Sequence, residues 1–396
     1  MRVLVLGGYG AMGQVITRDL TESPEVKEVI VAGREIVKAE ALVSELKSPK
    51  LRPAQIDATD SDLARKIKEV NPDVLVNASW YEFNMNVMPA AIAASTHYVD
   101  LGGLYHMTQR QLKLDSLARD SGVLCVLGMG STPGVTNVMT AYGAGLLDKV
   151  SIIKIRTASA VLDKNYAFQA PYSIRTVLDE FSAKPVVFRN GRVTEIEALS
   201  GKETLDFPKP IGSVEGYYTL HSELASMPQK YKAKGCRDID FIVAYPKDFT
   251  EIVASLVKVG MADKKPINVK GAHISPYDFL TEVVRRIPAP KQPVKDVDAL
   301  RVDIQGLKDK KKTSLRIESV IPYHNRWKLS SGAVDTGVPP SIIAQWIAKR
   351  KIKQTGVTTP EDAVEPLPFF KELALRDRGI KVFLQEGKGK QKPLFK

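Results

Sequence analysis

Three glycines near the start of the chain could cradle a phosphate. Gly8, Gly10 and Gly13 form a G-x-G-x-x-G pattern after a short apolar stretch and before a helical pattern. In that context Gly8 permits a tight turn, Gly10 lets a pyrophosphate approach the backbone, and Gly13 lets helix and strand pack closely. Ala11 and Met12 lie in the first helical turn, whose N–H groups face the phosphates. The pattern predicts a nicotinamide dinucleotide site.

The residues after the second expected strand bear on which dinucleotide binds. An Asp or Glu commonly binds the ribose hydroxyls of NAD there, but this chain reads Gly33-Arg34-Glu35. A guanidinium can pair with a 2′-phosphate, so Arg34 predicts NADP as the cofactor. In the alternative, Arg34 is a surface residue and Glu35 binds the ribose of NAD.

Ligands of open α/β sheets lie beyond the carboxyl ends of the strands. Asp100 ends one such strand on the expected nicotinamide side, where a carboxylate could stabilise a cationic iminium. A plain turn or helix-cap aspartate is the alternative reading. The other strand ends supply the remaining predicted cofactor contacts, which are Asp57, Ala58, Ala78, Ser79 and Gly102.

Candidate substrate groups come from the second half of the chain. Residues 217–223 read YYTLHSE, where His221 could exchange a proton near neutral pH and Glu223 could hold an ammonium. We predict His221 and Glu223, together with Asp100, as catalytic residues. Tyr172 and Arg175 could bind a hydroxyl and a carboxylate of the substrate, although each could equally be an ordinary surface or interface residue.

The segment 130–137, GSTPGVTN, ends the first half of the chain. Free N–H groups at Gly134 and Val135 would form an anion nest for a substrate carboxylate, with Asn137 beside it. The same segment could serve only as a bridge between domains. The histidines show no metal-ligand spacing, and the H-x-E at residues 221–223 lacks a C-x-x-C partner, so no metal is predicted.

These candidates need two kinds of scaffold. Residues 1–147 alternate short apolar strands with helices, which predicts a doubly wound parallel sheet of the Rossmann α/β class. Residues 148–330 predict an α+β domain with a mostly antiparallel or mixed sheet, with Asn190-Gly191 as a hairpin turn. Residues 331–396 are expected to return as helices that pack on the first domain. The segments expected as β are 151–156, 186–188, 193–196, 239–244, 254–261 and 314–320.

Composition narrows the class of protein. The 396 residues are 44% hydrophobic and 26% charged, as in globular proteins. We expect a cytoplasmic protein without a membrane partner, because no apolar run would span a bilayer and the first residues do not resemble a signal peptide. The net charge of +12 divides into −2 for residues 1–147 and +14 for the rest. Because no nucleic-acid-binding motif accompanies it, we expect no nucleic-acid partner.

Several segments together resemble the saccharopine dehydrogenase-like family, which includes saccharopine reductases, lysine 6-dehydrogenases and carboxynorspermidine dehydrogenases. The resemblance rests on LGGYGAMG at residues 6–13, SWYEFN at 79–84, YVDLGG at 98–103, STPGVTN at 131–137, TGVP at 336–339 and TTPEDAVEPLPFFKEL at 358–373. It implies a Rossmann domain, a second α/β domain inserted before the returning helices, and a homodimer formed through that second domain.

The resemblance also implies hydride transfer between a nicotinamide and the carbon of a C–N bond. We expect an NADP(H)-dependent oxidoreductase whose small-molecule substrate is a saccharopine- or lysine-like amino acid. Lysine 6-dehydrogenases carry an acidic residue after the second strand, where this chain has Gly33-Arg34. One alternative is an NAD-dependent lysine 6-dehydrogenase. Another is a nicotinamide-binding sensor or scaffold without turnover.

Overall fold

The structure is a computed structural model that describes the whole chain except residues 164–167, 169, 289–293, 377–379 and 396. In the described part of the chain, a seven-stranded parallel sheet forms the first lobe, in the order β17-β6-β5-β4-β1-β2-β3. Its strands are β1 (Arg2–Leu6), β2 (Glu28–Gly33), β3 (Leu51–Gln55), β4 (Val74–Asn77), β5 (His97–Asp100), β6 (Leu124–Val126) and β17 (Gly356–Thr358).

Helices cover both faces of this sheet, because its short strands are apolar on both sides. They are α1 (Ala11–Glu22), α2 (Ile36–Leu46), α3 (Leu63–Val70), α4 (Asn84–Ala93), α5 (Leu104–Leu112) and α6 (Asp115–Asp120), with the short 3₁₀ helix η1 (Tyr81–Phe83) after β4. The Rossmann-type α/β prediction is confirmed. The strand β1 pairs in parallel with both β2 and β4, which places the glycine loop at the centre of the sheet.

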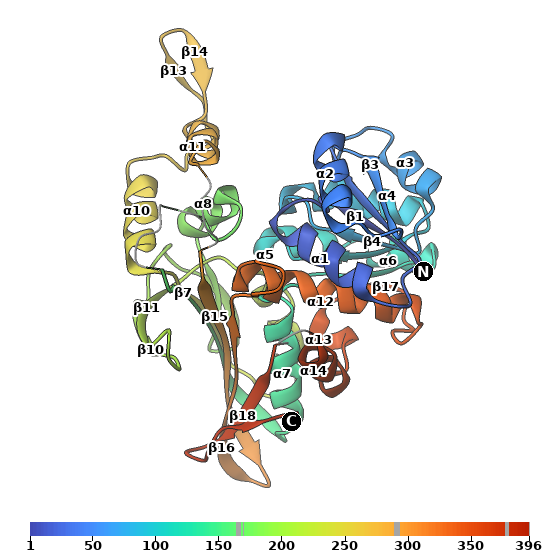
Figure 1. The fold of residues 1–396 in the computed structure, drawn as a ribbon. Coiled ribbons are helices and arrows are strands. Elements are labelled where there is room, and N and C mark those ends of the chain that lie inside the picture. The colour runs from blue at the N-terminus through green and yellow to red at the C-terminus, as the bar shows by residue number, and fades with distance from the viewer. Residues whose placement is uncertain (164–167, 169, 289–293, 377–379, 396) are drawn as a thin grey trace.

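The second lobe is built on a long, curved sheet in the order β10-β11-β12-β7-β15-β16-β18-β19, with β8 and β9 attached through β12 (Figure 1). The pair β12–β7 is parallel, whereas β7–β15 and β15–β16 are antiparallel, so the prediction of a mixed sheet is confirmed. The strands are β7 (Lys149–Val161), β8 (Val186–Arg189), β9 (Arg192–Glu195), β10 (Glu203–Asp206), β11 (Ser213–Tyr218), β12 (Asp238–Ala244), β15 (Asp296–Lys308), β16 (Lys311–Pro322), β18 (Val382–Glu386) and β19 (Lys392–Pro393).

Further helices and a small hairpin complete the described structure. They are α7 (Val135–Gly145), α8 (Ile174–Ser182), η2 (Ser222–Ala225), α9 (Met227–Lys232), α10 (Lys247–Lys258), β13 (Ile267–Val269), β14 (Ala272–Ile274), α11 (Pro276–Arg285), α12 (Ser331–Ala348), α13 (Pro360–Ala363) and α14 (Pro366–Leu375). Figure 1 shows β13, β14 and α11 as an arm that projects beside the Rossmann lobe, with α8 at its base.

Two local predictions had opposite outcomes. Asn190 and Gly191 do form the turn between β8 and β9, and both have positive φ angles, of 50° and 78°, as a two-residue hairpin turn requires. Residues 254–261 were predicted as β because they resemble the alternating or β-rich segments of this half of the chain, and that prediction is wrong. Helix α10 runs through Lys258 instead and buries Phe249 and Val253, which lie one helical turn apart.

The returning segment does more than pack helices on the first lobe. Helix α12 lies against α1, so closely that a Cβ atom added at Gly337 would lie 2.6 Å from the Cβ atom of Val15. Beyond that helix, β17 extends the Rossmann sheet next to β6, and β18 and β19 extend the second sheet next to β16. The chain end therefore connects the two lobes, which the expectation of helices alone did not include.

Candidate active site

The glycine loop lies between β1 and α1 and has the shape that a pyrophosphate requires. The N–H groups of Gly7 and Gly8 donate to the carbonyl oxygen of Ala32, at 2.8 and 3.0 Å, which fixes the turn against β2. A Cβ atom at Gly13 would lie 2.0 Å from the Gly7 carbonyl oxygen, so only glycine fits there.

The Gly10 side of the loop is open. A Cβ atom at Gly10 would meet only the Gly7 carbonyl oxygen, at 3.1 Å. Gly10 also caps α1 without any side-chain hydrogen bond, and the first turn of the helix holds no acidic residue. The N-terminus of α1 thus keeps its positive dipole end toward this opening, so the dinucleotide phosphates fit here.

The end of β2 presents Arg34 to solvent. The Arg34 side chain is 65% exposed, and its Nε atom lies 3.7 Å from Oε1 of Glu35. The backbone N–H of Glu35 donates to the hydroxyl of Tyr9 at 3.0 Å, and a Cβ atom at Gly33 would lie 2.5 Å from the Tyr9 ring. The hydrogen bond and ion pair of Glu35 with Lys38 lower the pKa of Glu35, so this carboxylate is charged beside Arg34.

A cavity of about 440 Å³ lies between the carboxyl ends of the Rossmann strands and the second sheet. Five of the predicted cofactor contacts line it: Ala11, Met12, Ala78, Ser79 and Gly102. The second lobe and α12 supply its remaining polar wall, which includes Thr157, Ser159, Tyr172, Ser173, Thr176, Glu180, His221, Ser222, Tyr245, Asp298, Asp335 and Thr336. Gly8, Gly10, Gly13 and Arg34 lie outside this lining, in the glycine loop and after β2. Asp57 and Ala58 lie outside it as well: Oδ1 of Asp57 accepts from the N–H and hydroxyl of Thr59, and Ala58 is buried.

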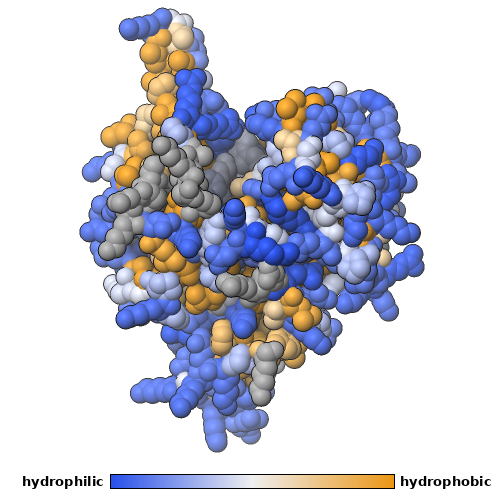
Figure 2. Space-filling view, in the orientation of Figure 1, coloured by the Kyte–Doolittle hydropathy of each residue, from blue (hydrophilic) through white to orange (hydrophobic). Residues whose placement is uncertain are grey.

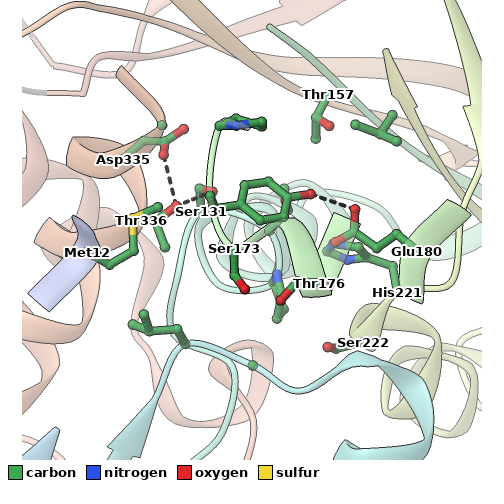
Figure 3. Close-up of a pocket in the computed structure, with 18 of the residues that line it drawn as sticks. Met12, Ser131, Thr157, Ser173, Thr176, Glu180, His221, Ser222, Asp335 and Thr336 are labelled. Atoms are coloured by element: carbon green, nitrogen blue, oxygen red, sulfur yellow. Dashed lines mark hydrogen bonds between the residues drawn. The ribbon is translucent and has the colours of Figure 1, made fainter. Parts of the chain in front are cut away.

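Two sets of side chains face each other across this cavity. Figure 3 shows Met12, Ser131, Asp335 and Thr336 on one side, and Glu180 with His221 on the other. The first side belongs to the Rossmann lobe and α12, and the second belongs to α8 and the segment before η2. A substrate in the cavity would therefore contact both lobes.

Glu180 is held by two tyrosines. Its Oε2 atom accepts the hydroxyl of Tyr172 at 2.6 Å and that of Tyr245 at 2.9 Å, and the two hydroxyls also contact each other. Burial raises the pKa of Glu180, whereas the nearby His221 and the two tyrosine donors oppose that shift. The predicted residue Tyr172 therefore lines the cavity as part of a carboxylate-centred cluster.

His221 and Glu223 form a buried pair. The Nδ1 atom of His221 contacts Oε2 of Glu223, and Thr136 donates its hydroxyl to the other carboxylate oxygen at 3.0 Å. The His221 ring stacks on Phe241, with ring centres 3.8 Å apart. Burial by itself would lower the pKa of His221, but the Glu223 carboxylate outweighs it and the net pKa lies above the ordinary value. This histidine is suited to donate a proton near neutral pH.

On the opposite side, Asp298 of β15 and Asp335 of α12 both line the cavity. Thr336 donates its hydroxyl to Oδ1 of Asp335 at 3.1 Å and shares a hydrogen bond of 3.0 Å with the Ser131 hydroxyl. Burial and the neighbouring Asp296 carboxylate raise the pKa of Asp298 to about 7. Burial and Asp298 likewise raise the pKa of Asp335. Asp298 is therefore ready to take up or release a proton near pH 7.

Comparisons with known proteins agree with this architecture. The saccharopine dehydrogenase NADP binding domain model matches residues 3–126, and the saccharopine dehydrogenase C-terminal domain model matches residues 130–380. The chain belongs to the saccharopine dehydrogenase family. As a member of this family it is an NAD(P)-dependent oxidoreductase, and its first lobe binds a nicotinamide dinucleotide.

Individual relatives are similar over nearly the whole chain. A carboxyaminopropylagmatine dehydrogenase from Synechocystis sp. is 23% identical over 94% of this chain and 95% of its own length. A carboxynorspermidine synthase from Vibrio cholerae is 24% identical over 94% of both proteins. Among solved structures, a saccharopine dehydrogenase (L-Glu forming) from Saccharomyces cerevisiae covers 99% of both chains with a TM-score of 0.73 and 19% identity, which supports the fold.

Within the family fold, Asp100 does not reach the cavity, so the prediction that it acts on the substrate is wrong. It is fully buried, and its Oδ1 atom accepts the N–H groups of Gly102 at 2.9 Å and Gly128 at 2.6 Å. Its Oδ2 atom accepts from Gln111 at 2.7 Å and from the Tyr98 hydroxyl at 3.0 Å. Asp100 braces the loops after β5 and β6, as a turn aspartate would.

The predicted anion nest at residues 134–137 is also wrong. The N–H of Gly134 donates to Oδ1 of Asn137 at 2.9 Å, and the N–H of Val135 donates to the Gly130 carbonyl oxygen at 3.0 Å. The Asn137 amide in turn donates to Oε2 of Glu361 at 2.7 Å. Because these groups are satisfied internally, Gly134 and Asn137 start helix α7 and leave no free donors for a substrate.

Arg175 lies at the edge of the site and not in its lining. Its Nη2 atom is 3.0 Å from Oδ1 of Asp278, and its guanidinium carbon lies 4.7 Å from the centre of the Trp80 ring. A substrate carboxylate at this position would compete with Asp278. The arginine instead contributes to the contact between the two lobes.

Sequence reasoning missed three carboxyl groups of the cavity, Glu180, Asp298 and Asp335. A signal existed for Asp298, because Asp296 and Asp298 alternate with apolar residues and thus share one face of a strand. Asp335 directly precedes the TGVP segment.

Among the described residues no group of three or more His, Cys, Asp and Glu side chains is arranged to hold a metal ion. No described helix is long and apolar enough to cross a membrane.

Proposed function

We propose that this oxidoreductase transfers a hydride between NADP(H) and the carbon of a C–N bond in an amino acid that also carries a cationic amine. The substrate would be lysine-like or polyamine-like. The curated relatives are named for carboxynorspermidine and carboxyaminopropylagmatine, and these names support a substrate in which an amine is joined to an amino acid.

The main support for this substrate class is the acidic lining of the cavity. Glu180, Asp298 and Asp335 line it, and among the residues described around it none is Lys or Arg. The basic group of this lining is His221. A compound with several carboxylates, such as saccharopine, would need cationic partners there, whereas an ammonium or guanidinium group would be attracted by the carboxylates. This favours an amine-rich substrate over a saccharopine-like one.

The protein's own groups then have distinct parts in the reaction. The glycine loop, Ala11, Met12, Ala78 and Ser79 would hold the dinucleotide, which supplies the hydride when bound. In the reductive direction the carbon of the substrate's C=N bond would receive the hydride, and protonated His221 would donate a proton to the nitrogen, so that the C=N bond becomes a CH–NH bond. Glu223 would stabilise the protonated form of His221 before the transfer. In the oxidative direction neutral His221 would accept the proton of the amine.

The test is a set of steady-state assays on the purified protein. NADP⁺ and NAD⁺ are each combined with carboxynorspermidine, carboxyaminopropylagmatine, lysine and saccharopine, and the formation of reduced cofactor is followed. The proposal expects turnover with NADP⁺ and an amine-rich substrate, and at least about a hundredfold loss in His221→Ala, the contribution typical of a general acid. Turnover on saccharopine alone would contradict the substrate assignment. Turnover on lysine with NAD⁺ would support a lysine 6-dehydrogenase, and cofactor binding without any turnover would support a sensor.

A homodimer through the second domain and a cytoplasmic location remain part of the proposal. Exposed apolar side chains gather at the end of α10, on β13 and on α11, among them Val259, Ile267, Val269 and Phe279. Figure 2 shows hydrophobic colour along this projecting arm. Light scattering would measure the mass of the particle and so test whether the protein is a dimer.

The cysteines bear on the proposed cytoplasmic location. Cys125 and Cys236 are both free and buried, as is usual in a reducing compartment.

A further inference from the structure

A set of polar contacts connects the two lobes at the edge of the cavity. The hydroxyl of Tyr81, in the Rossmann loop after β4, donates to Oδ2 of Asp179 on α8 at 2.6 Å. The Nζ atom of Lys264 lies 2.9 Å from Oδ1 of Asp179 and 2.9 Å from Oε1 of Glu82. We call Tyr81, Glu82, Asp179 and Lys264 the interdomain latch.

The second lobe holds Asp179 in place from its own side. The hydroxyl of Tyr277, on α11, donates to Oδ2 of Asp179 at 3.1 Å and lies 3.0 Å from the carbonyl oxygen of Arg175. The side chain of Asp179 is 8% exposed, although its partner Lys264 is 53% exposed. Both oxygens of this carboxylate thus have partners, and Tyr81 and Tyr277 donate to the same oxygen from different lobes.

The latch lies directly beside the cavity. Tyr81 contributes to its lining from the Rossmann side, whereas Thr176 and Glu180 contribute from α8. Asp179 immediately precedes Glu180, so one helical turn contacts the other lobe through one residue and the cavity through the next. Figure 2 shows a notch between the projecting arm and the Rossmann lobe. Any movement that separates Tyr81 from Asp179 would also move Glu180 away from the cofactor side.

We propose that Asp179 is a positioning residue of this enzyme, which fastens α8 to the Rossmann loop and so keeps the Glu180 wall opposite the bound cofactor. Asp179 acts on the substrate only through this placement. When the latch is broken, a smaller fraction of the protein has both walls of the cavity in place. The apparent affinity for a substrate that contacts both walls then falls by that fraction. Binding of the cofactor by the Rossmann lobe is unaffected.

A matched pair of variants separates this role from simple stabilisation. Tyr81→Phe and Tyr277→Phe each remove one tyrosine hydrogen bond to the same oxygen of Asp179, but the first breaks a contact between lobes and the second a contact within one lobe. We expect Tyr81→Phe to raise KM for the amine substrate about tenfold, the scale of one hydrogen bond to a charged group. We expect Tyr277→Phe to change KM by less than about threefold, with NADPH affinity unchanged in both variants.

Hydrogen exchange gives a readout that does not depend on knowing the substrate. In the NADPH-bound protein, Tyr81→Phe and Asp179→Asn should each increase exchange in both η1 and α8, whereas Tyr277→Phe should increase it only in α8 and α11. The double variant Tyr81→Phe/Asp179→Asn should have no larger effect than Asp179→Asn alone. Equal effects of the two tyrosine variants on η1, or additive effects in the double variant, would overturn the proposal. If no substrate is turned over, that result contradicts the proposed reaction only, because the hydrogen-exchange measurement needs no substrate.

Discussion

Glu223 contacts the Nδ1 atom of His221 while its other carboxylate oxygen accepts the hydroxyl of Thr136 at 3.0 Å. Glu223 has no exposed surface, so its charge is compensated by these two partners and not by water. A histidine held in this way at Nδ1 keeps its Nε2 atom available for the cavity. Thr136 lies in the first turn of α7, between the two domains in the chain, so the orientation of His221 depends on the domain junction.

The first prediction concerns the pH dependence of reduction. The Glu223 carboxylate raises the pKa of His221 against the effect of burial, so His221 stays protonated to a higher pH than an ordinary histidine. If protonated His221 is the acid, kcat/KM of reduction should fall as the pH rises through that pKa. Glu223→Gln should move this fall to lower pH and reduce the rate at pH 7.5 by about tenfold or more.

The control for this prediction is Thr136→Val. It removes a hydrogen bond to Glu223 but keeps the charge beside His221, so the fall in kcat/KM should move much less than in Glu223→Gln. A profile that stays in place in Glu223→Gln would show that another group supplies the proton.

The second prediction uses two glycines of the same loop. Gly10→Val should weaken NADPH binding at least about a hundredfold while the melting temperature stays near that of the original protein. Its Cβ atom would meet little protein but would occupy the opening where the phosphates fit. Gly13→Ala should instead lower the melting temperature, because its Cβ atom would lie 2.0 Å from the Gly7 carbonyl oxygen. Fluorescence titration and thermal unfolding of both variants check the contrast, and equal NADPH affinity in Gly10→Val would contradict it.

The sequence predicted the structure correctly where a short pattern of residues is compatible with only one local conformation. The glycine spacing after an apolar strand predicted the turn between β1 and α1, and Asn190-Gly191 predicted a hairpin because few other dipeptides accept two positive φ angles. His221 and Glu223 were predicted together as catalytic residues since both lie in one short segment, and the structure brings them into contact, although Glu223 is not part of the cavity lining and does not face an ammonium there. In each case, neighbours in the sequence remain neighbours in space.

The sequence was uninformative where the fold joins distant segments. Glu180, Asp298 and Asp335 come from α8, β15 and α12, and nothing local marks them as parts of one cavity. The predictions that Asp100 acts on the substrate and that Asn137 binds it were wrong because both residues are bound to other parts of the protein. Both are polar residues at the edge of the Rossmann sheet, but the donors and acceptors that satisfy them, including Gln111 and Glu361, are set by tertiary packing.

The third prediction tests the acidic side of the cavity. The pKa of Asp298 is raised to about 7 by burial and the neighbouring carboxylate of Asp296, so Asp298 gains a proton and loses its charge as the pH falls below 7. KM for a cationic substrate should therefore rise on the acidic side. Asp298→Asn should raise KM at pH 8 by about one to two decades, as loss of a charge-assisted hydrogen bond implies, and should weaken this pH dependence.

Asp303 provides a matched control on the same strand. Its carboxylate pairs with Arg316 at 2.7 Å, away from the lining of the cavity. Asp303→Asn should leave KM unchanged at both pH values. If Asp303→Asn and Asp298→Asn raise KM to the same extent, the change in KM comes from a disturbance of strand β15 and not from lost recognition of the cation.

The last prediction concerns the choice between NADP(H) and NAD(H). Arg34 follows β2 directly, and its side chain is exposed enough to turn toward a 2′-phosphate. A charge-assisted hydrogen bond contributes about 1.5 to 3 kcal/mol, or roughly one to two decades in affinity. Arg34→Ala should remove most of the preference for NADPH with little effect on NADH. Glu35→Gln should increase the preference, because it removes a negative charge that lies 3.7 Å from the Arg34 Nε atom.

The structure changes what a substitution at Gly33 would test. An aspartate there would place its Cβ atom 2.5 Å from the Tyr9 ring, whose hydroxyl accepts the N–H of Glu35. We therefore expect Gly33→Asp to displace Tyr9 and weaken both cofactors, so it is not a clean exchange of specificity. Titrations of NADPH and NADH against the original protein, Arg34→Ala and Glu35→Gln at low and high salt decide the matter. The preference should weaken in high salt because the site is exposed. If the original protein binds NADH as tightly as NADPH, Arg34 has no role in selection and Glu35 becomes the candidate for the ribose contact.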